Sequence, residues 1–436
     1  MFKTLREALK VKEIRKRLIF TFLMLVVVRF GSQLPVPGVN SSVVKELFAR
    51  LNTDAFNLFN SFTGGSMENF SVFALSITPY ITSSIIMQLL TIAIPRLEEL
   101  QRDGEEGRKK IVEYTRYVTV ALALIESIAM AVGFGSQGVL EEYNWFSILV
   151  TVVTLTAGSA FLMWIGERIT ENGIGNGISV VLLINILSRI PDDVGVIYER
   201  FIAGRSIAAG VVVAIIILAV LVAIVLFTVL MNAAIRKIPV QYAQKMQGRR
   251  NVGRQQSHIP LKVNTAGVIP VIFASSLMTT PYMIAQFFNV DYSSIGGQIL
   301  LMLQSSYWFR ADYPWYSIGA VIYIALIIIF AYFYTSITFN PLEVANNMKK
   351  QGGFIPGIRP GKPTSDYLNK ILNYIVLIGA VGLVIVAIIP TIISSIFSIS
   401  RLSFLGTSLI IIIGVIIESL KQVETKMVAR EYDSIF

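Results

Sequence analysis

Cysteine is absent from this chain of 436 residues, and histidine occurs only once. The absence of cysteine excludes disulfides, iron–sulfur clusters and thiol catalysis. The single histidine, His258, argues against a histidine-based metal site and against a Ser-His-Asp triad. It lies beside Pro260 in a basic stretch and is expected to be a solvated loop residue. No acid–base pair and no metal-binding cluster emerges from the sequence, so we expect neither an enzyme nor a cofactor.

Charge is also scarce, because only 15% of the residues are charged whereas a soluble domain carries roughly 25%. Apolar residues make up 54% of the chain. That share is enough for ten membrane spans, which would use roughly 20 residues each. The composition therefore predicts a polytopic helical membrane protein, whose solvent is mostly lipid.

Hydrophobic runs long enough to cross a bilayer recur along the chain. The clearest runs from Ile207 to Met231 and contains no charge. The weakest, 177–190, is kept as a span because a glycine-rich stretch precedes it and Pro191-Asp192-Asp193 follows it. The ten predicted spans are 18–34, 71–94, 112–133, 146–166, 177–190, 207–231, 265–288, 316–339, 371–391 and 403–420.

Basic residues predict the orientation of these spans. With the N-terminus inside, most of the 37 Lys and Arg fall in cytoplasmic segments and few fall in outer ones, which is the usual asymmetry of membrane proteins. Both termini are therefore expected in the cytoplasm. The first run is expected to be retained, because Gln33-Leu34-Pro35 follows it rather than the small-residue cleavage site of a signal peptide.

The spans divide into an N-terminal half, 1–200, and a C-terminal half, 201–436, with five spans each. An odd number per half means that any repeat would be inverted across the membrane. Two predicted cytoplasmic loops, about 234–264 and 340–370, are basic. Their charges either only set topology and meet anionic lipid, or form a docking site for a large anionic partner. Glycine and proline around Arg359 favour docking, because they shape a turn that presents one guanidinium.

Uncharged polar residues are unusually frequent in span 71–94, and the seventh span, which begins near Asn264, repeats the pattern. Such helices line an internal pathway or pack through small residues, and both interpretations stay open. The polar segment 57–70 is an outer loop or a re-entrant piece. Among charged residues in the spans, Arg29 is expected to snorkel to the outer interface, and the deeper Glu126 is a functional candidate.

Short motifs along nearly the whole chain resemble, in order, those of the SecY family, the central subunit of the bacterial protein-translocation channel. The matching segments include Pro35-Val36-Pro37-Gly38, Pro79-Tyr80-Ile81, Glu106-Gly107-Arg108-Lys109-Lys110, Gly173-Ile174-Gly175-Asn176-Gly177, Gln247-Gly248-Arg249-Arg250, Leu261-Lys262-Val263-Asn264, Pro356-Gly357-Ile358-Arg359-Pro360-Gly361 and Gly406-Thr407-Ser408-Leu409.

The resemblance implies an all-α membrane protein whose ten helices form two inverted five-helix halves around a central pore, with a lateral gate between spans two and three on one side and seven and eight on the other. A ring of bulky aliphatic side chains would exclude water and ions yet yield to a passing chain. Taken alone, each of these aliphatic residues is more simply explained by packing. The family's pore-ring positions fall on Ile81, Ile85, Leu182, Ile186, Ile272 and Ile411, with Leu182 in place of the commoner isoleucine.

Three further sets of residues follow from the same resemblance. The plug, about 57–70, would seat beneath the ring and includes Phe59, Phe62, Gly64, Gly65 and Met67. The lateral gate would contain polar Thr91 and Asn264. Docking of the SecA motor ATPase and of ribosomes would use Arg249, Arg250 and Arg359.

The function implied is a channel that passes unfolded secretory preproteins, recognised by a signal sequence, across the bacterial plasma (inner) membrane and releases apolar segments sideways into membrane lipid. The implied small membrane partners are SecE and SecG. The alternative hypothesis, an inverted-repeat solute transporter, predicts coupling carboxylates near the midplane that this sequence lacks. An intramembrane protease or a lipid-processing enzyme predicts paired aspartates, a Ser-His pair or a zinc motif within the spans, and none is present in the sequence.

Overall fold

The computed structural model describes residues 10–50, 60, 62–203, 207–242, 256–286, 293–309, 314–397 and 407–433. These residues form two compact units. The first unit comprises the described residues up to Arg200 and those from Glu418 onward, and the second comprises those from Phe201 to Ile417. The last helix therefore begins in the second unit and ends in the first. Whether the units correspond to the two inverted halves of the family stays a prediction.

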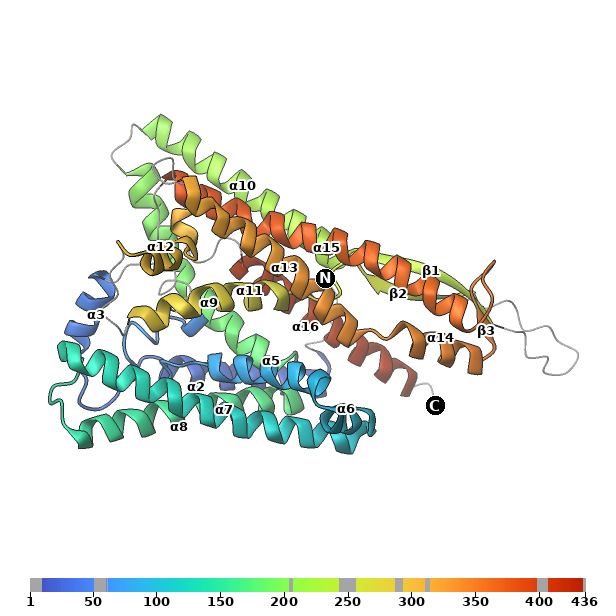
Figure 1. The fold of residues 1–436 in the computed structure, drawn as a ribbon, viewed down its shortest axis with the longest axis horizontal. Coiled ribbons are helices and arrows are strands. Elements are labelled where there is room, and N and C mark those ends of the chain that lie inside the picture. The colour runs from blue at the N-terminus through green and yellow to red at the C-terminus, as the bar shows by residue number, and fades with distance from the viewer. Residues whose placement is uncertain are drawn as a thin grey trace, which may run out of the picture. The chain divides into compact units, whose positions relative to one another are not determined.

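The first unit is built from helices joined by turns within its described residues. In it α7 and α8 run side by side, α5 packs against α7, and α2 packs against α8 (Figure 1). Its helices are α2 (Lys12–Gly31), α3 (Ser41–Arg50), α5 (Thr78–Ala93), α6 (Pro95–Arg102), α7 (Gly104–Phe134), a π-helical turn (Gly135–Val139), α8 (Trp145–Asn172) and α9 (Gly177–Ile197), followed by a second π-helical turn (Tyr198–Ile202).

The second unit combines helices with one small sheet. Here α13 lies between α11 and α15, and α10 also contacts α15 (Figure 1). Its elements are α10 (Ile207–Ala233), β1 (Ile235–Tyr242), β2 (Gln256–Lys262), α11 (Ile269–Gln286), α12 (Ile295–Met302), 3-10 turns (Ser305–Tyr307 and Pro314–Ser317), α13 (Ile318–Thr338), α14 (Pro341–Lys350), β3 (Gly353–Phe354), α15 (Lys362–Phe397) and the start of α16 (Thr407–Asp433).

Each of the ten predicted spans overlaps one of these helices. Among the described residues, five helices are long and apolar enough to cross a membrane, and α5 with α6 makes a sixth candidate that is bent by 106°. The number of crossings and the sides on which the termini lie stay predictions. The five helices are Gly104–Val139, Trp145–Asn172, Ala209–Ala233, Pro314–Lys350 and Lys362–Ile392.

Several helices begin or end away from the predicted span limits, and two of these differences have a clear local cause. The run 71–94 is helical only from Thr78, because the residues before it form turns in which Ser76 has a φ of +53°, outside the helical region. The helix that begins at Gly177 does not stop before Pro191 but continues through it to Ile197. Proline within a helix removes one hydrogen bond and usually bends the helix, but it does not always end it.

The basic loops contain a three-stranded antiparallel sheet in the order β2-β1-β3, which the sequence analysis missed. Ile238 pairs with Ile259 in register, and His258 therefore lies on an exposed strand rather than in a loop. Ile238 and Leu261 pack in one apolar cluster with Met348 of α14 and Leu368 of α15. The sheet is thus attached to the helical part of its own unit by a small hydrophobic core.

Candidate functional site

The segment predicted as the plug folds into tight turns within the first unit. Phe59 lies outside the described residues, whereas Asn60 and 62–70 are described. The backbone N–H of Gly65 donates to the carbonyl of Asn60 at 3.0 Å, and Gly64 and Gly65 have φ values of +65° and +83°. Because residues with a Cβ rarely adopt these values, the glycine pair allows the chain to reverse here.

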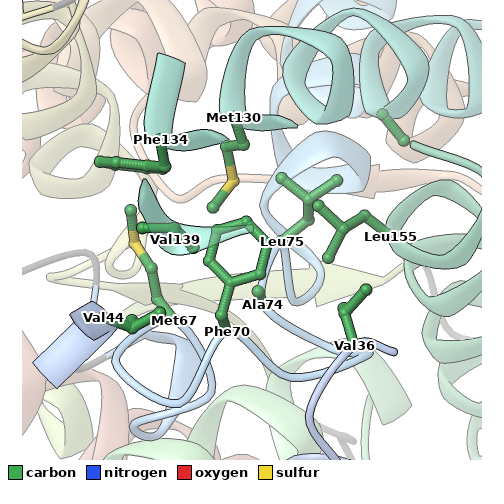
Figure 2. Packing of buried hydrophobic residues seen from close by; sticks show 11 residues of the cluster. Val36, Val44, Met67, Phe70, Ala74, Leu75, Met130, Phe134, Val139 and Leu155 are labelled. Atoms are coloured by element: carbon green, nitrogen blue, oxygen red, sulfur yellow. The ribbon is translucent and has the colours of Figure 1, made fainter. Parts of the chain in front are cut away.

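One side of this plug segment is apolar and buried. Met67 and Phe70 are only 3% and 1% exposed. Their side chains lie among Val44, Met130 and Phe134 (Figure 2). The rings of Phe70 and Phe134 meet edge to face, with centroids 6.2 Å apart, an arrangement that stabilises beyond simple burial by about 0.5–1.5 kcal/mol. This side anchors the plug segment to α3 and α7.

The other side of the plug segment is polar and is bound by side chains of α2 and α9. Arg29 Nη1 donates to the carbonyl of Gly64 at 3.0 Å, and Asn185 Nδ2 donates to a second plug carbonyl at 3.0 Å. Arg189 Nη1 pairs with Glu68 Oε2 at 3.0 Å. Arg29, which was expected to snorkel to the outer interface, thus also has its guanidinium turned toward the plug segment.

The start of α9 is fixed by local hydrogen bonds. Asn176 Oδ1 accepts hydrogen bonds from the backbone N–H groups of Ile178 and Ser179 at 3.1 and 3.3 Å. This side chain is an N-cap, which stabilises a helix by about 1 kcal/mol. Thr170 of α8 accepts from the N–H of Gly177 at 2.9 Å. The glycine-rich stretch before the fifth predicted span thus determines where α9 begins relative to α8.

Replacement of Gly64 by alanine is expected to destabilise the plug segment by more than about 1–2 kcal/mol, the usual penalty for a Cβ in the left-handed region. The added Cβ would also lie 2.9 Å from Asn185 Cα, a backbone atom that cannot rotate away. Gly38 is the matched control, because its φ is +76° and nothing lies within 4 Å of an added Cβ. Thermal unfolding of both alanine variants in detergent measures the difference. Equal losses would contradict the crowding at Gly64.

The structure brings some of the predicted pore-ring residues of the first unit together. Ile81 of α5 and Leu182 of α9 belong to one apolar cluster, against which Phe62 of the plug segment also packs. Leu182 and Ile186 are buried at 6% and 1% exposure, whereas Ile85 is half-buried. The cluster explains the burial of Leu182 as packing, and the role of these residues in a pore ring stays a prediction.

The remaining predicted ring and gate residues are divided between the two units. In the second unit Ile272 is half-buried, Ile411 is buried, and Asn264 Nδ2 donates to Asn232 Oδ1 at 2.7 Å. In the first unit, the buried hydroxyl of Thr91 donates to a backbone carbonyl one helical turn earlier at 2.7 Å. Both polar gate candidates are therefore hydrogen-bonded within their own units.

The predicted docking arginines are only partly described. Arg249 and Arg250 lie outside the described residues. Arg359 is exposed in a turn between Gly357 and Gly361, whose φ values are +82° and +103°. The turn that glycine and proline predicted there is confirmed, and it presents the guanidinium to solvent.

Groups that could perform chemistry are sparse. Within the described residues, no cluster of three or more His, Asp or Glu side chains could hold a metal ion. Glu126, the candidate in the third span, is half-buried on α7. Its carboxylate is not part of any constellation described above, and no role is assigned to it.

Comparison with solved structures identifies the class of protein. The fold matches a structure described as that of a protein conducting channel, with a TM-score of 0.63 at 17% sequence identity, over 96% of this chain and 94% of that one. It also matches Sec61 in the canine ribosome–channel complex of the endoplasmic reticulum, with a TM-score of 0.61 at 17% identity, over 96% and 94% of the two chains. The fold is therefore that of protein-conducting channels.

Comparison of the sequence identifies the family. The SecY family profile matches residues 71–420. The protein translocase subunit SecY of Bacillus subtilis is 42% identical, and that of Halalkalibacterium halodurans is 41% identical, each over 99% of both chains. The chain belongs to the SecY family, as its motifs predicted. Since this family consists of channel subunits, the expectation of a channel rather than an enzyme is confirmed.

Proposed function

We propose that this chain forms the channel of a bacterial Sec translocon. It passes unfolded secretory preproteins across the plasma membrane and releases apolar segments sideways into lipid through a lateral gate. Ten spans in two inverted halves, with both termini in the cytoplasm, complete the proposed architecture. The observation that carries the proposal is full-length similarity to named translocase subunits, joined to a fold shared with protein-conducting channels.

Three sets of residues control the opening of the channel in this proposal. Residues 57–70 act as the plug, supported by the close packing of Met67 and Phe70 within the first unit. The six aliphatic residues named above form the ring that excludes water and ions. Thr91 and Asn264 contribute to the lateral gate, where exposing them to lipid costs free energy and favours the closed state.

The proposed partners follow from chemistry and from similar proteins. SecE and SecG are the small membrane subunits. The chain carries no nucleotide-binding motif, so the SecA motor or the ribosome supplies the driving force. A ribosome partner is supported by fold neighbours that were seen in ribosome–channel complexes. Basic loops suit ribosomal RNA, because attraction to phosphate needs no sequence specificity. Arg249, Arg250 and Arg359 are the proposed contacts.

Import into vesicles tests this function. Purified chain, SecE and SecG are placed in lipid vesicles with SecA, ATP and a radiolabelled precursor, and protease-protected precursor is measured. Protection that requires ATP is expected. The variant Arg359→Glu is expected to lower it about tenfold, as the loss of one charge-assisted contact predicts.

The matched control is Lys45→Glu, which reverses an exposed charge on the predicted outer side and is expected to leave import unchanged. Import unaffected by Arg359→Glu would keep the channel but move the docking site elsewhere. Absence of import, together with saturable uptake of a small solute, would contradict the channel and favour the transporter.

A further inference from the structure

We propose that Asn185, Ser188 and Arg189 of α9, with Arg29 of α2, form a latch that holds the plug segment in its seat and so sets the leak of the closed channel. The three α9 residues stand at i, i+3 and i+4 and therefore share one face of the helix. The latch deepens the proposed function and rests on it. All of its contacts lie within the first unit.

The first contact joins Phe62 of the plug segment to Ser76, which follows that segment. Asn185 Nδ2 donates to the carbonyl of Phe62 at 3.0 Å and to Ser76 Oγ at 3.1 Å. Ser76 Oγ in turn donates to the same Phe62 carbonyl at 3.4 Å, and Ser159 Oγ donates to the carbonyl of Ser76 at 3.2 Å. Ser76 has a φ of +53° without being glycine, a strained conformation that persists only where surrounding bonds hold it.

The second contact is made to the carbonyl of Gly64 at the tip of the reversal. Arg29 Nη1 donates to this oxygen at 3.0 Å. The hydroxyl of Ser188 lies 3.4 Å from the same oxygen but donates at 2.6 Å to the carbonyl of Asn185 on its own helix. An ionised donor makes a hydrogen bond roughly twice as strong as a neutral one. Arg29 of α2 is therefore the main donor to this backbone atom of the plug segment, and Ser188 of α9 lies beside it.

The third contact is the ion pair between Arg189 and Glu68. Their side chains are only 20% and 36% exposed, so solvent screens the pair incompletely. Asn60 Nδ2 donates to the same Glu68 oxygen at 2.9 Å, and Asp192 lies 3.4 Å from Arg189.

These additional partners make the latch reversible. If the plug segment leaves, Glu68 keeps Asn60 and Arg189 keeps Asp192. Neither charge is stranded, and stranding a buried charge is the most expensive consequence of breaking an ion pair. The arrangement therefore favours the seated plug without locking it.

Ion leak through vesicles that contain the chain with SecE and SecG tests the latch. Glu68→Gln and Arg189→Gln are each expected to raise the leak about tenfold, since one charge-assisted bond shifts an equilibrium by about that factor. The double variant is expected to leak no more than either single variant, because both remove the same pair. Arg189→Lys is expected to restore part of the seal.

The matched control is Glu167→Gln, which breaks the ion pair of Glu167 with Arg116 (2.7 Å) between α7 and α8, away from the plug. Its leak is expected to equal that of the unaltered chain. Melting temperatures are measured in parallel, so that a general loss of stability is distinguished from release of the plug.

A second readout follows the plug segment itself. The chain has no cysteine, so Asn69→Cys provides a single reactive thiol in the plug segment. Its alkylation by a membrane-impermeant maleimide is expected to be about tenfold faster with Arg189→Gln, by the same equilibrium argument. If Arg189→Gln does not fold, the same alkylation rate is measured with Glu68→Gln, which breaks the same ion pair.

Two results would overturn different claims. Normal import with unchanged leak and labelling in both Gln variants would overturn the latch and leave the channel intact. Absence of both import and leak in every form, including the unaltered chain, would overturn the proposed function and the latch with it.

Discussion

Truncation of Phe70 to alanine is expected to lower the stability of the first unit by about 3–5 kcal/mol, the usual loss for a buried aromatic ring. Phe70 is 1% exposed, and its ring occupies the centre of the cluster drawn in Figure 2. Removing the ring leaves a cavity beside Met67 and Phe134, which cannot close without moving α7. The melting temperature of the complex in detergent is expected to fall by more than about 5 °C.

Phe146 provides the matched control, because the same truncation is made on a ring that is 72% exposed on α8. Its loss opens no cavity, and its melting temperature is expected to stay unchanged. A similar fall for Phe146→Ala and Phe70→Ala would contradict the packing argument.

The backbone of Phe70 lies in the left-handed region, which affects the choice of substitution. Phe70 has a φ of +44°. Glycine is normally less stable than alanine in regular structure by about 0.5–1 kcal/mol, but in the left-handed region a Cβ costs about 1–2 kcal/mol. Phe70→Gly is therefore expected to melt at a higher temperature than Phe70→Ala, the reverse of the usual order.

Replacement of Gly177 by alanine is expected to destabilise the first unit by about 1–3 kcal/mol, the usual range for overpacking. An added Cβ would lie 1.8 Å from the carbonyl oxygen of Gly166, so α9 would have to move away from α8. Alanine is a better helix former than glycine by about 0.8–1 kcal/mol in a helix interior. The overlap outweighs this gain, because the added Cβ and the carbonyl oxygen of Gly166 are both fixed by the backbone and cannot rotate apart.

Gly195 is the matched control on the same helix, since nothing lies within 4 Å of a Cβ placed there. Gly195→Ala is expected to stabilise by about 0.5–1 kcal/mol through helix propensity alone. Thermal unfolding should therefore shift in opposite directions for the two alanine variants. A stabilising Gly177→Ala would show that α8 and α9 are not in close contact at this point.

The features that could be predicted from the sequence are those with a local cause. Long apolar runs such as Ile207 to Met231 could be predicted as helices, because hydropathy is a property of one segment alone. The turn at Gly173–Gly177 and the exposed Arg359 followed from glycine, asparagine and proline, whose backbone preferences need no distant partner. Family motifs added plug and ring positions, which composition alone does not distinguish from packing and which stay predictions.

The features that were missed depend on distant partners or on opposing local signals. Asn185 and Arg189 lie 123 and 121 residues from the plug atoms they bind, and their positions in the apolar fifth span carry no signal of this contact. The hairpin of β1 and β2 was hidden because Lys, Arg and Pro interrupt the alternation that marks a strand.

Because α16 belongs to both units, it also affects the order in which the chain folds. The backbone N–H of Gly175 donates to Gln422 Oε1, and Ile14 and Ile174 pack with Val423. Domains usually fold in the order of synthesis, but here the first unit includes residues from Glu418 onward, which are synthesised after the second unit. A truncated chain that stops before Glu418 leaves Ile14 and Ile174 uncovered. An unfinished translation product would thereby expose apolar surface that the finished chain buries.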